Sequence, residues 1–448
     1  MTLMGAVGLM AMFAVDLADL WFISLLGRVE TTAGIGFAGT VAFANLSIAL
    51  GLGIAAGALV AIRLGQGRVA AARRLAGAAL AVAMITGFVI AAGVQLTAVP
   101  LLRLLGASGA ALAEAVLYLR IVAVGFPLLA GAIILSFSLR AAGDPFRAMM
   151  VTLVVAVTNA TLDPLFIFGL DMGIAGAALA TLSANLFSFL TGWHGLVRVR
   201  RLLEIPRSAT VRAELPEIAR IAIPAVLTQL ATPFLVAYTM QAAARFGEGV
   251  VAAMTIVNRL VPVFFGVVFS LSGAVGPIIG QNFGARHFDR VRAAYAQGMG
   301  LAFGYTLFMA AVLFLFRHDV PGWFSVSGEA ATLATFFCTW LSWAWMFTGG
   351  QFVAQAAFNN LGHARLSTLF NWGRATVGTI LPVEIMSRFW GAHGLFTGAA
   401  LGSSVTGLVA ILAGWLLIDR LARQAGGRSM PSGRNSAGQD VSSRNGAS

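Results

Sequence analysis

Long runs of apolar residues constrain this chain more than any other feature. Successive stretches of about 20 or more residues carry few or no charges, and a helix of that length crosses roughly 30 Å of hydrocarbon. Hydrophobic residues make up 59% of the 448 residues and charged residues only 10%, a share that no water-soluble core needs. A helix also satisfies its own backbone polar groups within lipid. The sequence therefore predicts an all-α polytopic membrane protein.

Twelve membrane-spanning helices can be placed along the chain. They cover residues 3–26, 33–61, 75–100, 112–138, 147–170, 172–198, 216–245, 248–278, 291–316, 328–358, 364–388 and 391–418. The remaining tail is rich in Ser, Gly and Arg and has little to bury, so we expect it to be disordered.

An internal repeat divides these helices into two halves. Glycines, prolines and arginines recur at offsets between 215 and 219 residues: Gly65-Gln66-Gly67 with Gly280-Gln281-Asn-Phe-Gly284, Arg73 with Arg290, Gly143 with Gly362, Pro164 with Pro382, Gly173 with Gly391 and Gly176 with Gly394. Six helices per unit is an even number, so both halves enter the membrane from the same side, with a cavity between them. We predict two pseudo-symmetric six-helix lobes. They cover residues 1–198 and 216–418, joined by a cytoplasmic linker at 199–215 and followed by a cytoplasmic tail at 419–448.

The distribution of arginine predicts the topology. The chain has no Lys, and most Arg residues fall in alternate connections and in the tail. The opposite side carries only Arg28, Arg103, Arg245, Arg317 and Arg388. Basic connections stay in the cytoplasm, so we expect both termini inside a bacterial plasma membrane, with a retained first helix. The net charge of +12 does not indicate nucleic-acid binding, because the basic residues are scattered over short connections.

Two acidic residues lie inside predicted spans. Asp19 precedes Gly27, at the outer end of the first helix, by eight residues, and Asp163 precedes Asp171, at the outer end of the fifth, by the same interval. Each is therefore roughly 12 Å deep. A carboxyl group at bilayer depth is costly, so both are candidate sites for a proton or a cation. The alternative is a structural role, with the acids bonded to helix ends or paired with Arg120 or Arg259.

Two neighbouring polar residues extend this candidate site. Asn159 stands four residues before Asp163 and shares its helix face, and Thr181 reaches a similar depth on the returning sixth helix. Burial and a neighbouring carboxylate raise the pKa of such an acid, as proton loading near neutral pH requires. The same oxygens also suit a sodium ion, so the residues leave proton and sodium as alternatives. Asp16 stands one turn from Asp19, and its orientation is open.

Several sequence blocks resemble those of one transporter family. They are Leu139-Arg-Ala-Ala-Gly-Asp-Pro-Phe-Arg147, Leu162-Asp-Pro-Leu-Phe-Ile-Phe-Gly169, Gly173-Ile-Ala-Gly-Ala-Ala-Leu-Ala-Thr181 and Gly280-Gln-Asn-Phe-Gly-Ala-Arg286. As a set they are similar to the multidrug and toxic compound extrusion (MATE) family, over nearly the whole chain except the tail. The resemblance implies a twelve-helix antiporter that exports organic, often cationic and lipophilic compounds in exchange for protons or sodium ions.

The resemblance also implies roles for individual residues. Asp19 occupies the acidic position of the family's first-helix motif, and Asn159, Asp163 and Thr181 match a cation site in the amino-terminal lobe of one family branch. Ala177, one turn before Thr181, offers a backbone carbonyl to the same site. Other branches carry an acid in the seventh helix, where this chain has none, so coupling through the second lobe is in doubt.

The second lobe supplies candidate substrate contacts. An apolar cavity with a few polar handles suits a lipophilic cation, and aromatic and Met side chains bind such cations adaptably. The candidates are Gln229, Met240, Trp345 and Gln355. Glu384 stands four residues from Arg388, which favours a helix-end ion pair over a coupling role. The orientation of Arg259 and Arg374, both inside predicted spans, is open.

Two other functions were weighed against the antiporter. A lipid-linked oligosaccharide flippase of the same superfamily shares the architecture, but we would expect several basic residues around its cavity, and the Asp pair disfavours an anionic cargo. An integral-membrane enzyme requires clustered His, Cys or Ser groups, and none is evident. The single Cys338 excludes an internal disulfide and a Cys-cluster metal site. We expect no cofactor beyond the coupling ion, and a monomer with small organic molecules and the bilayer as partners.

Overall fold

The computed structural model describes residues 29–324 and 326–427, with side chains from Gly34 onward. Its elements, in chain order, are α2 (Val29–Gly65), α3 (Val69–Leu104), α4 (Gly109–Val124), α5 (Phe126–Ala141), α6 (Pro145–Pro164), η1 (Leu165–Gly169), α7 (Gly173–Trp193), η2 (His194–Val199), α8 (Ser208–Ala244), α9 (Glu248–Gly284), α10 (Phe288–Leu315), α11 (Val320–Trp323), α12 (Gly328–Phe336), η3 (Phe337–Leu341), η4 (Ser342–Ala344), α13 (Trp345–Asn360), α14 (Ala364–Ala375) and α15 (Val377–Gly427). The all-α membrane fold predicted from the sequence is confirmed.

The described helices correspond to the second through twelfth predicted spans. Nine helical segments are long and apolar enough to cross a membrane, or ten when α4 and α5, bent by 49° at Gly125, count as one. The segment Ala364–Ala425 holds two spans, because the backbone leaves helical geometry at Trp390 and Gly391 and reverses. The first predicted span, residues 3–26, lies outside the described residues.

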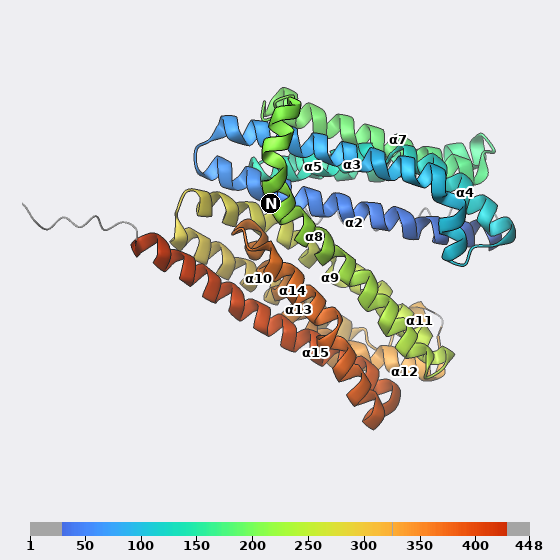
Figure 1. The fold of residues 1–448 in the computed structure, drawn as a ribbon. Helices are drawn as coiled ribbons and strands as arrows, with labels where there is room; N and C mark the ends of the chain where they lie inside the picture. The colour runs from blue at the N-terminus through green and yellow to red at the C-terminus, as the bar shows by residue number, and fades with distance from the viewer. Residues whose placement is uncertain (1–28, 325, 428–448) are drawn as a thin grey trace, which may run out of the picture.

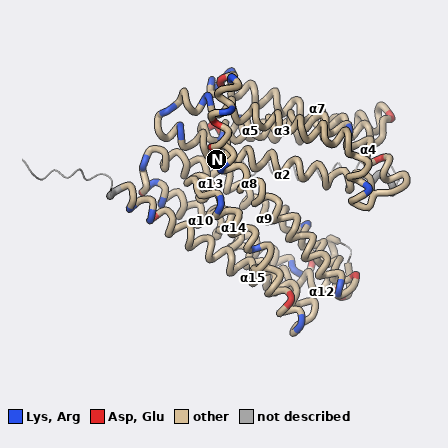
Figure 2. Tube along the Cα trace, viewed as in Figure 1, with Lys and Arg blue, Asp and Glu red and all other residues tan. Residues whose placement is uncertain are grey.

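Two lobes form a V (Figure 1). Helices α2 to α7 make one arm and α8 to α15 the other; the arms meet where α2 packs against α8 and α9, and diverge toward α4 and α12. We call the meeting end the closed end and the other the open end. Lys and Arg positions, all Arg in this chain, gather mostly at the closed end (Figure 2).

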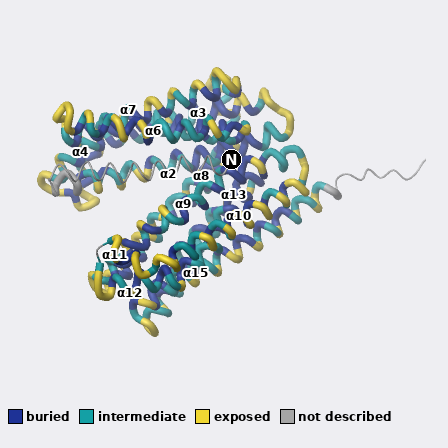
Figure 3. The backbone as a smooth tube through the Cα atoms, turned by 180° about the vertical axis from the view of Figure 1, so that it is seen from behind, coloured by how far each residue is buried: buried dark blue, intermediate teal, exposed yellow. Residues whose placement is uncertain are grey.

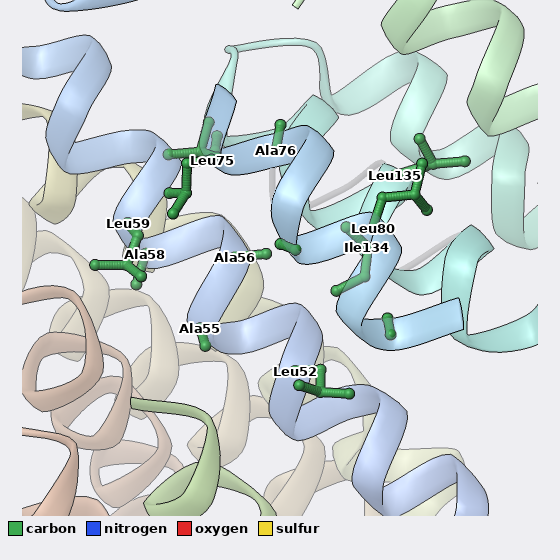
Figure 4. Close-up of a cluster of buried hydrophobic side chains, with 14 of the residues drawn as sticks. Leu52, Ala55, Ala56, Ala58, Leu59, Leu75, Ala76, Leu80, Ile134 and Leu135 are labelled. Carbon is green, nitrogen blue, oxygen red and sulfur yellow. The ribbon is translucent and has the colours of Figure 1, made fainter. Parts of the chain in front are cut away.

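The interior of the first lobe is built from small residues. Alanines alternate with leucines where α2, α3 and α5 meet, as Ala55, Ala58 and Leu59 on α2 and Leu75 on α3 illustrate (Figure 4). Small side chains let helix backbones approach closely, which is how helices associate in lipid. Some large apolar side chains, such as Ile134 and Leu135, are fully buried among them, and many others are exposed. Exposed positions follow the outer surface of both arms (Figure 3).

The same backbone turns recur in both lobes. Gly143 and Gly362 precede the fifth helix of their lobes and have φ of 75° and 80°, while Gly173 and Gly391 begin the sixth with φ of 53° and 54°. These positive values favour glycine, because a Cβ is strained in that region. The fourth helix of each lobe is also interrupted, between α4 and α5 at Gly125 and between η4 and α13. The repeat seen in the sequence therefore has a conformational counterpart.

Reciprocal glycine contacts join the lobes at the closed end. A Cβ at Gly65 on α2 would overlap the carbonyl oxygen of Gln281 on α9, and one at Gly284 would overlap that of Ile62. The two contacts are related by the internal repeat, since Ile62 corresponds to Gln281 and Gly65 to Gly284. Close approach of α2 and α9 therefore depends on glycine at both positions.

A salt bridge strengthens the same junction. Arg63 on α2 donates two hydrogen bonds to Glu214 on α8, at 2.9 and 2.6 Å, and its Nη2 lies 2.6 Å from Glu217. The Arg63 and Glu214 side chains are each only 15% exposed, so water screens their bidentate pair less than a surface pair. This junction joins α2, the second helix of the first lobe, to α8, the first helix of the second lobe.

A second ionic contact orders a turn at the closed end. Asp144 accepts hydrogen bonds from the Arg147 backbone and side chain and from Arg200 Nε. Burial alone would raise the pKa of the Asp144 carboxyl, but the hydrogen bonds from Arg147 and Arg200 outweigh it and lower that pKa. Asp144 thus ties the start of α6 to the segment that leads into the second lobe.

Enlarging Gly284 should open the closed end. Gly284→Leu forces α2 and α9 apart, at an overpacking cost of about 1–3 kcal/mol. The measurement is the distance between spin labels at Arg68→Cys and Arg286→Cys, both exposed, in a background without the buried Cys338. We expect longer and broader distances than in the parent protein. The control is Gly300→Leu on α10, where a Cβ meets nothing within 4 Å; an unchanged distribution in Gly284→Leu would contradict this description of the junction.

Candidate functional site

Asp163 lies deep inside the first lobe at the end of α6. It is 2% exposed and is followed by Pro164 and the π-helical turn η1. Asn159, one turn earlier, is 6% exposed, and its Oδ1 has no hydrogen-bond partner within the described part of the chain. The two side chains share a face of α6, as predicted from their spacing. A buried acceptor beside a buried carboxyl supplies oxygen ligands of the kind that hard cations prefer.

Thr181 and Ala177 lie on α7, which packs against α6 and η1. A Cβ at Gly176 would meet the backbone of Phe166 and Ile167, which sets the antiparallel register between η1 and α7. That register places Thr181 between the levels of Asn159 and Asp163. Ala177 is buried, and the half-buried Thr181 donates its hydroxyl to the Ala177 carbonyl at 3.1 Å. The geometry is compatible with the predicted oxygen cluster, which stays a prediction.

The two remaining acids of the predicted site are not part of the structure described. Asp19 and Asp16 lie outside the described residues. Within those residues, no group of three or more His, Cys, Asp or Glu side chains is arranged to hold a metal ion. The described part of the predicted cation site therefore consists of residues on α6 and α7.

The predicted substrate contacts are dispersed through the second lobe. Met240 is partly buried in the apolar cluster that joins α8, α9 and η3, and its sulfur accepts from Asn258 Nδ2 at 3.7 Å. Trp345 stacks on Phe265 with ring centroids 5.2 Å apart. Gln229 is half-buried on α8, and Gln355 is buried on α13. Met240 and Trp345 pack against the same apolar cluster, and the role of all four residues in binding remains a prediction.

A ladder of buried polar side chains is a feature that sequence reasoning missed. Asn359 and Gln355 on α13 face α14, where Ser367 Oγ donates to Asn359 Oδ1 at 2.9 Å and Gln355 Nε2 donates to Asn371 Oδ1 at 3.2 Å. Asn371 Nδ2 in turn donates to the Thr228 carbonyl on α8 at 2.6 Å. The spacing of four residues between Gln351, Gln355 and Asn359 is the signal that would have placed them on one face.

Glu384 forms an ion pair with a different partner from the one predicted. Its Oε1 lies 2.6 Å from Arg245 Nη1 at the end of α8 and accepts from the Tyr238 hydroxyl at 3.1 Å. Arg245 comes from a separate helix, so its proximity to Glu384 is not visible in the local spacing that suggested Arg388. The role expected for Glu384, a helix-end ion pair, agrees with this geometry.

The structure orients the three arginines whose direction was open. Arg120 on α4 and Arg259 on α9 are exposed, whereas Arg374 on α14 is 6% exposed. Arg120 and Arg103 border a hollow of about 710 Å³ formed by α3 and α4. A second hollow of about 680 Å³ lies in the other lobe beside Trp340 and Trp390. Neither hollow is lined by residues from both lobes.

Comparison with known proteins identifies the family. The MatE family profile matches residues 6–165 and 224–383, which covers both lobes. The chain belongs to the MATE transporter family. It is a transporter of this family and not an enzyme, and it is an integral membrane protein. The two matched ranges repeat the two-lobe division read from the sequence.

Named relatives carry different cargoes. The FAD transporter of Shewanella oneidensis is 29% identical over 430 residues, covering 94% of this chain and 93% of that protein. The multidrug export protein MepA of Staphylococcus aureus is 28% identical over 325 residues, covering 71% of this chain and 70% of that protein.

The fold matches solved MATE structures. A Vibrio cholerae MATE transporter, VcmN, superposes with a TM-score of 0.90 at 24% identity, covering 94% of this chain and 97% of that one. An outward-facing multidrug resistance MATE transporter superposes with a TM-score of 0.85 at 26% identity, covering 94% of this chain and 95% of that one.

Asn159 allows a test of the cation site that is separate from transport. Asn159→Ala removes a buried acceptor that has no hydrogen-bond partner in the described part of the protein, so we expect little loss of Tm without ions, but a smaller rise of Tm when sodium is added or pH is changed. Thermal unfolding of purified protein across sodium concentration and pH measures both. The control is Thr161→Ala on α6, an exposed residue whose hydroxyl bonds only its own helix. An ion response identical to that of the parent protein would remove Asn159 from the site.

Proposed function

We propose that this chain is a secondary active antiporter that exports organic compounds in exchange for protons or sodium ions. The observation that carries the proposal is the almost complete burial of Asp163 within a membrane-spanning lobe, beside an Asn159 Oδ1 that no described residue bonds. An ionisable group at this depth is costly and, within membrane helices, marks ion and proton pathways. A site that loads and releases a cation makes this cost part of a transport cycle.

The orientation follows from the charge distribution. Most arginines lie at the closed end, and arginine-rich connections stay in the cytoplasm. We therefore propose that the closed end faces the cytoplasm of a bacterial cell, with both termini there, and that the open end faces outward. The proposed functional unit is one chain.

The exchange cycle uses the two-lobe geometry. In this proposal the cation enters from the open side, binds between α6 and α7, and displaces the cargo outward; the lobes then close there and separate at the α2 and α9 junction. Ion binding drives this change only if it favours one conformation over the other, because a ligand with equal affinity for both shifts nothing. The names of the relatives support organic cargo, since one is a multidrug export protein and another an FAD transporter.

Efflux from proteoliposomes tests the proposal. Asp163→Asn removes the exchangeable charge while keeping the shape of the side chain, so efflux driven by an imposed proton or sodium gradient should fall at least tenfold, toward the rate without protein. Asp171→Asn, an exposed position in the turn after η1, is the control and should retain the parental rate. A gradient-driven rate that is unchanged in Asp163→Asn would reject the assigned role.

A further inference from the structure

A buried arginine in the second lobe is not explained by cation coupling. Arg374 lies on α14 and is 6% exposed. Its Nη2 donates to Asn371 Oδ1 at 3.2 Å, and its Nε has no hydrogen-bond partner among the residues that the structure describes. A neutral amide oxygen does not compensate a guanidinium charge. Arg placed at the centre of a membrane helix costs ~2.5–3.5 kcal/mol even on the mildest scale.

The described acids of the same lobe do not supply a counter-charge. Glu214 and Glu217 pair with Arg63, and Asp289 and Asp419 pair with Arg292. Three more stand at the starts of helices: Glu248, Asp319 and Glu329. The eighth, Glu384, is paired with Arg245. A buried charge without an opposite charge is strongly unfavourable, and such groups are retained where a ligand completes them.

The polar ladder leads to Arg374. Asn359 is hydrogen-bonded to Ser367, and Gln355 is hydrogen-bonded to Asn371. The two helices are antiparallel, so moving back four residues along α13 corresponds to moving forward four residues along α14. The next step places Gln351 at the level of Arg374. Gln351 is 2% exposed, its Nε2 donates to the Phe370 carbonyl, and its Oε1 is unpartnered within the described part of the lobe. The ladder thus ends in two incompletely bonded side chains.

The backbone is also interrupted at this level. Thr376 separates α14 from α15 with φ −107° and ψ −94°, outside helical geometry, and Thr379 Oγ1 donates to the Arg374 carbonyl at 2.7 Å. Broken helices near the centre of the membrane are typical of transporter binding sites, because irregular backbone is tolerated there only when buried or facing a cavity. A buried cation and a helix break therefore coincide.

We propose that Arg374 binds an anionic group, a phosphate or a carboxylate, on the transported compound. Its Nε and terminal nitrogens form a fork that matches these groups, and Asn371 holds the guanidinium in place from its Nη2 side. This inference rests on the proposed transport function and narrows its cargo to organic compounds that carry a negative group. It also revises the expectation that the acidic first lobe disfavours an anionic cargo, because the opposite charge lies in the other lobe.

Equilibrium binding without a gradient tests the inference. Riboflavin and flavin mononucleotide differ by one phosphate group, and flavin fluorescence reports binding of either to protein in nanodiscs. We expect the parental chain to prefer flavin mononucleotide, and Arg374→Gln to weaken its binding by about tenfold to a hundredfold, the worth of a charge-assisted hydrogen bond. Riboflavin binding should stay unchanged. Arg374→Lys keeps the charge but not the fork and should retain part of the preference.

Arg259→Gln is the matched control, since Arg259 is an exposed arginine in a membrane helix of the same lobe. It should keep the full preference. The inference is overturned if the parental chain shows no preference, if Arg374→Gln keeps it, or if Arg259→Gln loses it equally. Inorganic phosphate tests whether the site binds a free anion instead of an anionic group on the cargo. If inorganic phosphate raises the Tm of the protein as much as flavin mononucleotide does, the site does not bind cargo.

Two further measurements are needed. The first distinguishes cargo binding by Arg374 from a structural role, and the second distinguishes this inference from the transport proposal. Arg374→Gln removes an uncompensated buried charge, so the ligand-free protein should unfold at the same or a higher temperature; a lower Tm would show that the guanidinium is structurally paired and contradict the inference. Asp163→Asn should lose gradient-driven efflux yet keep the preference for flavin mononucleotide. Cation coupling through Asp163 and anion binding by Arg374 can therefore be tested independently, the first by efflux and the second by equilibrium binding.

Discussion

The cost of placing a charged or polar side chain in hydrocarbon organises this molecule. Most buried positions carry an apolar residue, so each buried polar group needs a specific reason. Where a partner exists, the reason is packing: the ladder between α13 and α14 bonds side chain to side chain and fixes the register of two helices. Asp163 and Arg374 are the ionisable groups that the account depends on. Asp163 is buried beside the Oδ1 of Asn159, and neither this Oδ1 nor the Nε of Arg374 has a hydrogen-bond partner among the described residues. Together they place opposite charges in opposite lobes.

The junction at the closed end is the contact that must separate when the transporter changes conformation. The lobes touch at one end through the reciprocal glycine contacts, the bidentate pair of Arg63 and Glu214, and an apolar cluster to which α8 contributes Ile218, Ile221 and Ala222. The internal repeat matters here, because Gly65 and Gly284 make equivalent contacts from the two sides. A transporter that rocks between two faces needs such a contact, tight enough to close one side and limited enough to release it.

The helices and part of the candidate site could be predicted from the sequence, because both depend on local patterns of residues. Spans of apolar residues and the repeated glycines are local signals, so the two-lobe helical fold and the common face of Asn159 and Asp163 could be predicted. Partners that depend on register between distant helices could not: Glu384 pairs with Arg245 on α8, and the ladder depends on the turn between α13 and α14. The direction of Arg374 was also inaccessible, because a helix apolar on nearly every side offers no polar face against which to orient one residue.

The most direct measurement of the central claim is whether the charge state of Asp163 sets the conformation of the lobes. Ser108 and Ser327 begin α4 and α12 at equivalent positions of the repeat, and both are exposed at the open end. Spin labels at these two positions report the separation of the arms in nanodiscs as pH or sodium concentration is varied. The account predicts that the distance distribution shifts with the ion in the parental chain and stays fixed in Asp163→Asn. An Asp163→Asn protein whose arms still move with the ion as the parental chain does would contradict it.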